Sequence, residues 1–402
     1  MHSKFSNLLA GIIFAFSSGL QAQTGNPQFF DVLDGQFDVS GYLSENAYGF
    51  LPVPIIITDP AVDGGLGMVG LIFHETDEEK ENRLKAMQSA EKGAIQHLLP
   101  PSVSFLAGAY TGNDSWFIGG GHMGFFKQGR IRYTGGGGYG DINLDYYGSG
   151  NVTLNRPVEL KTKATGVFQS LQFKLGNSPF FAGMSQQYIS ANISVNTFGS
   201  IEDRLPPAFI DALKNLFTTD VTTSALGVNL ELDTRDNIFS PHQGYRYKFE
   251  QLFFRGSFGS DIDYELYKLQ GLNYWKMSPH WRLGLKVASE YARSDDLLPP
   301  FATPSISLRG IPAARYQGEF VAAMETELTW QVNSRWSVLG FAGAGRASNS
   351  TSGFSDATTR ATQGAGFRYH IARRYGFDMG LDLARGPEDT VFYITAGSAW
   401  GR

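Results

Sequence analysis

The sequence has no cysteine, so a disulfide framework cannot stabilise it. Charge is scarce as well: Asp, Glu, Lys and Arg make up 18% of the 402 residues. The formal net charge of −5 leaves no basic excess for nucleic acid. Beyond the N-terminus, no stretch approaches the roughly 20 apolar residues that a transmembrane helix needs. A large hydrogen-bonded sheet, or lipid, must therefore hold the chain together.

Glycine and aromatic residues are abundant instead. The chain contains 48 glycines, and Phe, Trp and Tyr make up 14% of it. Many glycines and aromatics combined with few charges are typical of an all-β protein with many turns, and of a membrane barrel in particular.

The first 22 residues have the features of a secretory signal peptide. Lys4 gives a positive start, residues 8–16 form an apolar run too short to span a bilayer, and Ala22 offers a small residue for cleavage. A buried core helix is the alternative. We expect export, with 23–52 as a short periplasmic segment, too short for a domain of at least roughly 50 residues. Residues 53–402 are expected to form the barrel.

Apolar and polar residues alternate with a period of two from about residue 101 onward. Between 319 and 332, for example, Met324 and Trp330 share one face while Glu325 and Glu327 share the other. Successive side chains of a strand point to opposite faces. Charges on one face, and an apolar face ending in an aromatic residue, indicate lipid outside and a polar lumen inside.

Turn signals divide the chain into sixteen predicted strands. They are 53–59, 64–74, 101–111, 115–126, 130–147, 157–176, 180–194, 222–234, 244–256, 262–276, 280–293, 317–332, 335–346, 358–371, 374–386 and 389–400. If the first strand runs outward, the short connections are periplasmic and the long ones external, as in bacterial outer-membrane barrels. The predicted fold class is all-β: a sixteen-stranded antiparallel transmembrane β-barrel.

One periplasmic connection is long. Residues 76–99 predict a short helix, because Thr76 and Glu79 form a capping box and a weak apolar stripe follows. The segment is either a solvated linker helix or a periplasmic lid that docks a partner.

Signals for chemistry are weak. Gly65, Gly67 and Gly70 have dinucleotide-binding spacing, but the segment continues as a strand and no helix opens at the last glycine. The seven histidines are scattered, with no pair at i, i+3 or i+4 spacing. A Ser/His/acid site assembled across strands, as in a barrel lipase, is a rival that no motif supports. We expect no enzyme activity, no cofactor and no metal.

A polar cluster at 233–244 separates two alternating runs. It is either a metal or catalytic site or a tight turn. As a turn, Asp233 and Asp236 would accept backbone N–H groups, Arg235 would pair with them, and Pro241 and Gly244 would set the bends.

The last segment also alternates, with Phe392, Ile394 and Trp400 on one face. An amphipathic closing strand with a near-terminal aromatic resembles the assembly signal of outer-membrane barrels, which we assign to Phe392, Ile394, Gly397 and Trp400. The alternative is an ordinary edge strand, which would invite aggregation unless it closed a barrel.

Three stretches together resemble the bacterial surface antigen family of the BamA/TamA superfamily. "DTRDNIFSPHQGYRYKFE" (233–250) is similar to its D-x-R-D-N-x-x-x-P-x-x-G turn, "SISLRGIPAARYQGEF" (305–320) to its VRGF/Y loop motif, and "ARGPEDTVFYITAGSAW" (384–400) to its closing strand. The resemblance covers about 53–400, and it favours a periplasmic turn at 233–244 over a metal site.

The resemblance implies that the external loop 294–316 folds into the lumen, with Leu308, Arg309, Gly310 and Ile311 as its motif. In the family this arginine contacts acids on the barrel wall. The expected partner of Arg309 is Glu327, with Glu325 and Glu319 nearby. The family's second acid belongs to an F-x-D-x-G pattern, but Gly343 stands at that position here, so Glu325 is the candidate to replace it.

The function implied by the resemblance is outer-membrane biogenesis in a Gram-negative cell, by protein insertion or export or by lipid handling. It would act through a weak seam between 53–59 and 389–400, where Pro52 and Pro54 donate no ladder hydrogen bonds. Residues 23–52 cannot hold the POTRA domains of the family's insertases.

The expected partners are outer-membrane lipids, the barrel-assembly machinery that would insert the protein itself, and an unknown periplasmic partner. Nucleic acid is not expected. Two alternatives stay open: a passive, porin-like solute channel, and a barrel with no transport role.

Overall fold

The computed structural model describes residues 29–31, 34–45, 50–74, 81, 102–148, 158–197, 219–373 and 376–400. The predicted signal peptide and, apart from Glu81, the predicted helix at 76–99 lie outside the described residues.

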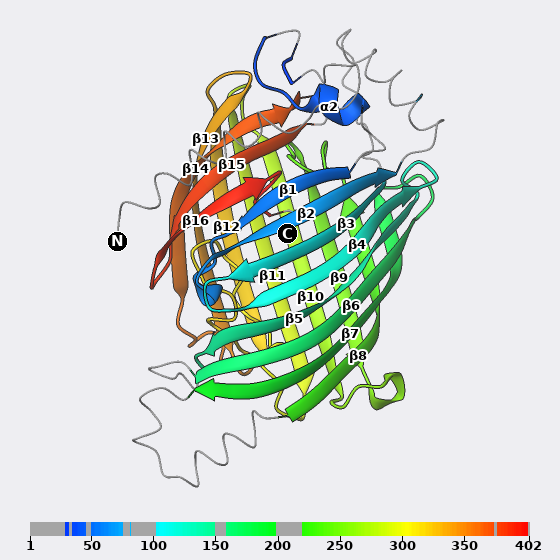
Figure 1. The fold of residues 1–402 in the computed structure, drawn as a ribbon, viewed down its shortest axis with the longest axis vertical. Coiled ribbons are helices and arrows are strands. Elements are labelled where there is room, and N and C mark those ends of the chain that lie inside the picture. Colours follow the sequence, from blue (N-terminus) through cyan, green and yellow to red (C-terminus); the bar gives the residue numbers. More distant parts are fainter. Residues whose placement is uncertain are drawn as a thin grey trace.

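Sixteen strands form one antiparallel sheet, in which each strand pairs with its neighbour in sequence and which curls into a nearly closed barrel (Figure 1). The strands are β1 Phe50–Ile57, β2 Gly65–His74, β3 Ser102–Thr111, β4 Trp116–Phe126, β5 Ile131–Tyr146, β6 Val158–Lys174, β7 Phe180–Thr197, β8 Thr219–Asp233, β9 Gly244–Phe254, β10 Tyr264–Lys276, β11 Trp281–Ser294, β12 Phe320–Gln331, β13 Trp336–Ser348, β14 Arg360–Ala372, β15 Phe377–Arg385 and β16 Thr390–Ala396.

The predicted barrel and its strand order are confirmed. Strand ends lie within three residues of their predicted positions, except that β16 ends at Ala396 rather than at residue 400. Three short helices are also described: α2 Ser40–Glu45, η2 Pro60–Val62 and η4 Gly256–Phe258. Within the described part of the chain, none of the helices is long and apolar enough to cross a membrane.

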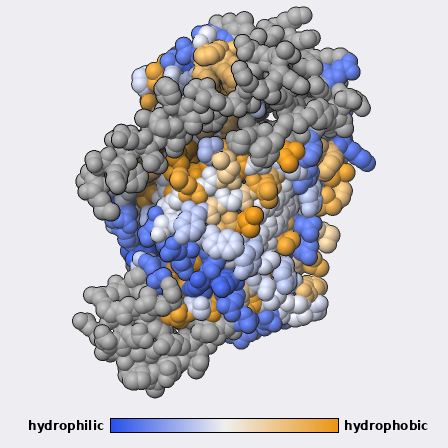
Figure 2. Space-filling model, in the orientation of Figure 1, coloured by the Kyte–Doolittle hydropathy of each residue, from blue (hydrophilic) through white to orange (hydrophobic). Residues whose placement is uncertain are grey.

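Alternation sorts the side chains between the lumen and the outer face. On β12, Val321 and Glu325 are buried on the lumen side, whereas Met324 and Trp330 are exposed on the outer face. Trp330 stacks on Trp281 of β11, with ring centroids 6.1 Å apart. Figure 2 shows apolar side chains spread over the middle of the visible wall, among residues of near-neutral hydropathy. This outer face suits a lipid environment.

The two ends of the barrel differ. One end, which we call the turn end, carries six connections of four to ten residues: 127–130, 175–179, 234–243, 277–280, 332–335 and 373–376. The opposite loop end carries the longest connection that the structure describes in full, 295–319.

The sheet stops at β1 and β16, and no ladder joins these strands within the described residues. Both are short, with 8 and 7 residues, whereas β5, β6 and β7 have 16, 17 and 18. Pro52 and Pro54 of β1 have no N–H to donate, which limits how this strand can pair. We call the junction between β1 and β16 the seam.

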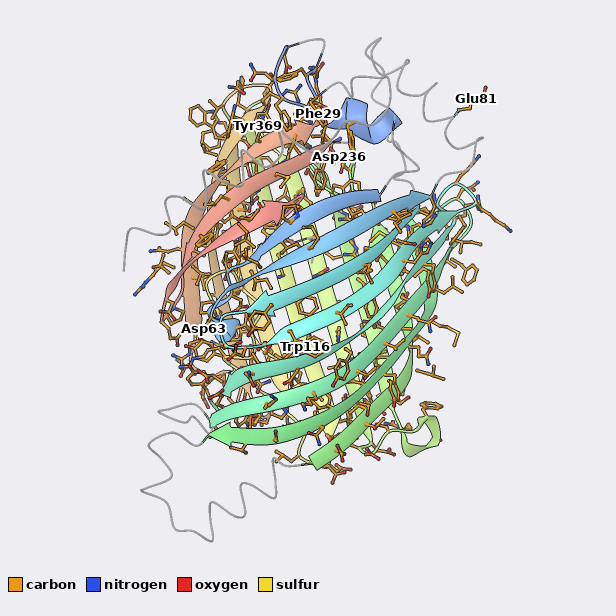
Figure 3. All side chains as sticks on the ribbon, in the orientation of Figure 1. Phe29, Asp63, Glu81, Trp116, Asp236 and Tyr369 are labelled. Atoms are coloured by element: carbon orange, nitrogen blue, oxygen red, sulfur yellow. The ribbon has the colours of Figure 1, made fainter. Side chains whose placement is uncertain are left out.

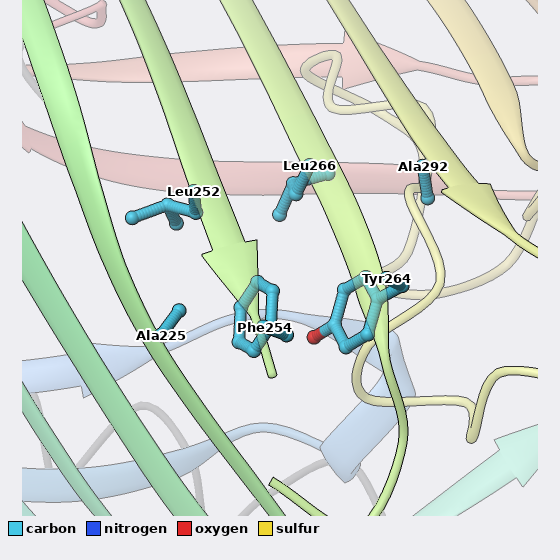
Figure 4. Packing of buried hydrophobic residues seen from close by; sticks show 6 residues of the cluster. All are labelled: Ala225, Leu252, Phe254, Tyr264, Leu266 and Ala292. Carbon is cyan, nitrogen blue, oxygen red and sulfur yellow. The ribbon is translucent and has the colours of Figure 1, made fainter. Parts of the chain in front are cut away.

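A hydrophobic cluster lines the lumen side of β8–β11 near the loop end (Figure 4). It consists of Ala225, Leu252, Phe254, Tyr264, Leu266 and Ala292. The rings of Phe254 and Tyr264 stack with centroids 3.9 Å apart. Leu298 and Ala302 of the connection 295–319 pack against this cluster, so burial of apolar surface draws the connection into the barrel.

Candidate functional site

We call the connection 295–319 the lumenal loop. Ser305 and Gln317 form a bridge that closes its tip. Beyond the bridge, Ile306, Leu308 and Ile311 are buried against lumen-facing residues of β12, chiefly Val321 and Ala323. The loop therefore lies inside the barrel and presents its motif to the wall.

Arg309 lies at the centre of the site, with a side chain only 8% exposed. It forms ion pairs of 2.7 Å with Glu325 and 2.9 Å with Glu327, both on β12, and one of 2.8 Å with Asp382 on β15. The ring centroid of Phe341 lies 3.6 Å from the guanidinium carbon. One cation of the loop thus holds carboxylates from two strands that β13 and β14 separate.

Asp382 is fully buried and also forms an ion pair with a second arginine, Arg368. Arg368 of β14 donates hydrogen bonds of 2.6 and 2.9 Å to its two oxygens. We call Arg309, Glu325, Glu327, Arg368 and Asp382 the Arg309 cluster. Burial alone would lower the pKa of Arg309, but Glu327 and Glu325 raise it above its ordinary value, so its charge is permanent.

The structure brings Glu325 and Glu327 to Arg309, but it does not bring Glu319, which lies exposed just before β12 and outside the cluster. Asp382 and Arg368 were not predicted from the sequence to belong to this site. Alternation along 374–386 places Asp382 on the lumen face, and that was the available signal.

Gly343, the position at which the resemblance would place an acid, has little free space around it. A Cβ built on Gly343 would lie 3.1 Å from Cδ2 of Leu308, so the loop motif itself occupies the space that an aspartate would need. Asp382 reaches Arg309 from β15 instead. The Arg309 cluster therefore contains the expected arginine, but one of its acids lies on β15 and not at position 343.

The loop motif also contacts the last strand and the connection before it. The backbone N–H of Gly310 donates a 2.9 Å hydrogen bond to the Tyr393 hydroxyl on β16. Gly310 and Gly386 approach so closely that a Cβ on Gly386 would overlap the Gly310 carbonyl. The Tyr316 hydroxyl bonds to Glu388. Burial, followed by this carboxylate, raises the pKa of Tyr316 to about 12.

The C-terminal residues depart from the expected strand. Gly397 has φ of +76°, and a Cβ there would lie 2.9 Å from the Phe239 carbonyl, so the chain bends inward at a position suited to glycine. Phe392 and Ile394 stay on the outer face, but Trp400 is 4% exposed and lies in the lumen. The predicted common face for Phe392, Ile394 and Trp400 is therefore wrong for Trp400, because the strand ends before it.

Trp400 joins the Arg309 cluster. Its indole N–H donates a 2.5 Å hydrogen bond to Glu325, and its ring packs against Tyr274 of β10 with centroids 5.7 Å apart. A Cβ on Gly284 of β11 would lie 2.7 Å from the indole, so this glycine makes room for it. Residues 397–400 continue the chain beyond β16. Through Trp400 they are held against the lumen side of β10, β11 and β12.

The polar segment 234–243 is the connection between β8 and β9. Asp236 accepts hydrogen bonds from the backbone of His242 and Gln243, Asp233 forms a 2.9 Å ion pair with Arg235, and Gly244 has φ of +100°. Pro241 is buried. Among the residues that the structure describes, no group of three or more His, Cys, Asp or Glu side chains could hold a metal ion.

This connection also supports the C-terminal bend. The Ser398 N–H donates a 2.6 Å hydrogen bond to the Phe239 carbonyl, and the hydroxyl of Ser240 accepts one from the Asp378 N–H of β15. The turn between β8 and β9 thus reaches across the turn end to the seam side of the barrel.

Residues 29–31 and 34–45 form a strap at the turn end. Arg335, in the β12–β13 connection, makes ion pairs of 2.7, 2.6 and 2.6 Å with Asp31, Asp34 and Asp38. The Val39 N–H donates to the Ile371 carbonyl of β14 at 2.8 Å. Figure 3 shows Phe29 and Tyr369 at the same end of the barrel as Asp236.

Electrostatics stabilise the strap at neutral pH. The hydrogen bond from Arg335 is the main cause that lowers the pKa of Asp34 to about 2. Burial works to raise the pKa of Asp38, but hydrogen bonds from Ser40 and Arg335 hold it below its ordinary value. Both carboxylates therefore stay ionised over the physiological range.

The similarity of this chain to known proteins is found among solved structures. No family model and no curated protein matches the chain. BamA from Haemophilus ducreyi lacking POTRA domains 1-3 has a similar structure, with a TM-score of 0.55 and 13% identity over 86% of this chain and 69% of that one. CdiB from Acinetobacter baumannii (0.53, 10% identity) and CdiB from Escherichia coli (0.55, 11% identity) match 86% of this chain and 59% and 62% of theirs.

At such identities the likeness concerns the fold alone. The chain is a transmembrane β-barrel with a fold like that of BamA and CdiB. The expected barrel fold is confirmed, and membership of the BamA/TamA superfamily and of its surface antigen family stays a prediction.

Proposed function

We propose that the protein acts in outer-membrane biogenesis, by inserting or exporting protein or by handling lipid at its seam. The carrying observation is that the lumenal loop contacts β16 directly, and that the Arg309 cluster contacts the residues that follow this strand. Gly310 bonds to Tyr393 on the strand, and Glu325 bonds to Trp400 beyond its end. Movement of the lumenal loop would therefore alter the strand that forms one side of the seam.

An outer-membrane location with the turn end facing the periplasm fits this proposal, and the likeness to BamA and CdiB barrels supports it. The proposed partners are outer-membrane lipids, the barrel-assembly machinery during the protein's own insertion, and an unknown periplasmic partner. A barrel without enzyme activity belongs to the same proposal.

Insertion of an unfolded client barrel into liposomes that contain the refolded protein tests the proposal. We expect faster insertion than in empty liposomes, and loss of the gain with Arg309→Ala. Arg130→Ala is the matched control, since Arg130 is an exposed arginine of the 127–130 turn that bonds to Gly176 and Asn177. It should keep the full gain.

The same liposomes distinguish the rivals. A steady ion conductance that Arg309→Ala leaves unchanged, without client insertion or lipid flip, would replace the proposal with a passive channel. Absence of insertion, lipid flip and conductance would leave a barrel without a transport role.

A further inference from the structure

The lumen wall is apolar on one side of the barrel. The lumen-facing residues of the first strands include Val69 and Leu71 on β2, then Phe105, Ala107, Ala109, Phe117, Gly119, Gly121, Met123, Gly136, Gly138, Gly140, Ala164, Gly166 and Phe168 on β3–β6. Among the described residues of β2, β3 and β4, no charged side chain faces the lumen. The opposite wall carries Glu231, Arg246, Lys268, Glu290 and Glu325.

The apolar wall has the shape of a groove. Its floor is one row of paired residues, Ala107, Gly119, Gly138 and Gly166, about 14 Å long at the usual strand spacing of ~4.8 Å. The neighbouring row on one side has Phe105 and Phe168 at its ends, and the row on the other side has Phe117. Small residues thus lie between bulky ones.

Aromatic rings border the floor and stay open to the lumen. A Cβ on Gly121 would lie 2.8 Å from the ring of Phe105, and one on Gly136 would lie 3.3 Å from Phe168, so both rings rest on glycine backbone. Phe105, Phe117 and Phe168 are nonetheless 37%, 40% and 49% exposed. Water against these rings is unfavourable, so the groove favours an apolar occupant.

The floor row continues to the seam. Val53 of β1 pairs with Val69 of β2, and Val69 pairs with Ala107, the first floor residue. An apolar path therefore runs from the unpaired edge strand to β6. Because the seam borders the bilayer, lipid has direct access to this path.

We propose that the groove binds the acyl chain of a membrane phospholipid that enters through the seam. A polypeptide strand would need partners for its backbone N–H and C=O groups, and the backbone of β2–β6 is already used in ladders on both sides. An acyl chain needs none. A free fatty acid would have to bury its carboxylate on a floor whose rows contain no cation, since the lumen-facing Arg132 of β5 lies outside these rows and is already paired with Glu231 and Asp233. A phospholipid leaves its headgroup at the seam.

This inference deepens the proposed function, on which it rests, by naming lipid as what the seam admits. Photo-crosslinking tests it in the full chain, refolded into phosphatidylethanolamine/phosphatidylglycerol vesicles with a radiolabelled phospholipid. p-Benzoyl-phenylalanine would replace Phe117 in the groove. Reference positions are Ile118, 51% exposed on the outer face, and Gln270, on the polar lumen wall. We expect labelled lipid at Phe117 and Ile118, and not at Gln270.

Gly166 offers a matched pair of variants. The nearest atoms to a Cβ there, in Ile189 and Tyr188, are 4.0 Å away, so a side chain fits without moving the sheet. Gly166→Glu places a carboxylate on the floor and should lower the lipid adduct at Phe117 about tenfold, leaving the adduct at Ile118 unchanged. Gly166→Ala should preserve both adducts.

Lipid adduct at Phe117 no greater than at Gln270, or insensitive to Gly166→Glu in a folded barrel, would overturn the proposal. An adduct with added client barrel in place of lipid would also overturn it and would assign the groove to polypeptide. A lipid adduct with no client insertion and no lipid flip would sustain the groove while removing the proposed function, so the two failures are distinguishable.

Discussion

At the residue scale, the lumenal loop is held by buried carboxylates that lie close to arginine side chains. Glu325 and Asp382 are 2% and 0% exposed, and each would be costly without its cationic partner. Asp382 keeps Arg368 if the Arg309 side chain is removed, whereas Glu325 keeps only uncharged donors among its described hydrogen bonds, the indole N–H of Trp400 and the backbone N–H of residue 309. Arg309 is therefore the residue on which Glu325 depends most.

Arg309→Ala should lower the free energy of unfolding by about 3–5 kcal/mol, because it leaves a buried carboxylate unpaired. Arg309→Lys should lose a large part of the same stability, because an ammonium group cannot reproduce the forked contacts to Glu325 and Asp382. Urea titration in detergent or lipid, followed by tryptophan fluorescence, measures both changes. Equal stability of wild type and Arg309→Ala, with Arg130→Ala as reference, would contradict the prediction.

Trp400→Phe should keep the packing against Tyr274 and remove only the hydrogen bond to Glu325. We expect a loss of about 1–3 kcal/mol, since the bond ends on a buried charged acceptor. Trp400→Ala should cost more, because a cavity beside Gly284 adds to it. If Trp400→Phe and Trp400→Ala destabilise the barrel equally, the hydrogen bond has no separate contribution.

At the element scale, the strap and the lumenal loop secure opposite ends of the barrel. The strap binds the β12–β13 and β14–β15 connections before the chain enters β1, and the loop binds β12, β15 and β16 from inside. Arginine–carboxylate pairs contribute to both, together with apolar burial of the loop and the Val39–Ile371 hydrogen bond of the strap, and neither belongs to the strand ladders. Each can therefore release without disrupting the ladder of the barrel.

Arg335→Ala should free the strap, because three carboxylates then lie close together without their shared cation. We expect hydrogen exchange at the Val39 amide to accelerate by at least about tenfold, while strand amides in β5–β7 keep their protection. Arg346→Ala, at the loop end, is the control. Unchanged exchange at Val39 in Arg335→Ala would show that the backbone contacts alone hold the strap.

Acid should release the strap in the native sequence as well. The pKa of Asp34 is about 2 when the strap is docked, below its value of about 3.9 in an unfolded chain. The stabilisation is thus fully present above about pH 4 and is lost as the pH falls toward 2. Exchange at Val39 measured between pH 5 and pH 2 should show this profile, and Asp34→Asn should flatten it.

At the scale of the whole molecule, the barrel is asymmetric about its seam. The apolar lumen wall lies on the β1 side, while the Arg309 cluster and the inward-turned residues 397–400 lie on the β16 side. The absence of native cysteine makes the seam directly testable by disulfide trapping.

Cysteine pairs scanned between 53–57 and 391–395 should include at least one that forms a disulfide under mild oxidation. In that pair, oxidation should abolish client insertion or lipid flip, and reduction should restore it, because the proposed function requires the seam to open. A pair formed between β2 and β3, which stay laddered, should have no effect. Full activity of the oxidised seam pair would exclude gating at the seam.

The alternating sequence was enough to predict the sixteen strands and their faces, and the resemblance of 305–320 to a loop motif indicated Arg309. Strand alternation is local, with a period of two, and lipid on one side and a lumen on the other impose it on every strand. Glu325 and Glu327 followed from the same alternation, since both fall on the lumen face of the strand after the loop.

Which side chains contact one another inside the barrel depends on the tertiary structure. Asp382 replaces the missing acid at Gly343, Trp400 turns inward at Gly397, and Arg335 gathers three aspartates that lie about 300 residues away in sequence. These contacts depend on how the sheet curls and which strands then face one another across the lumen. A local periodicity contains no information about which distant strands face one another. The side-chain partners across the lumen therefore follow from the curvature of the sheet.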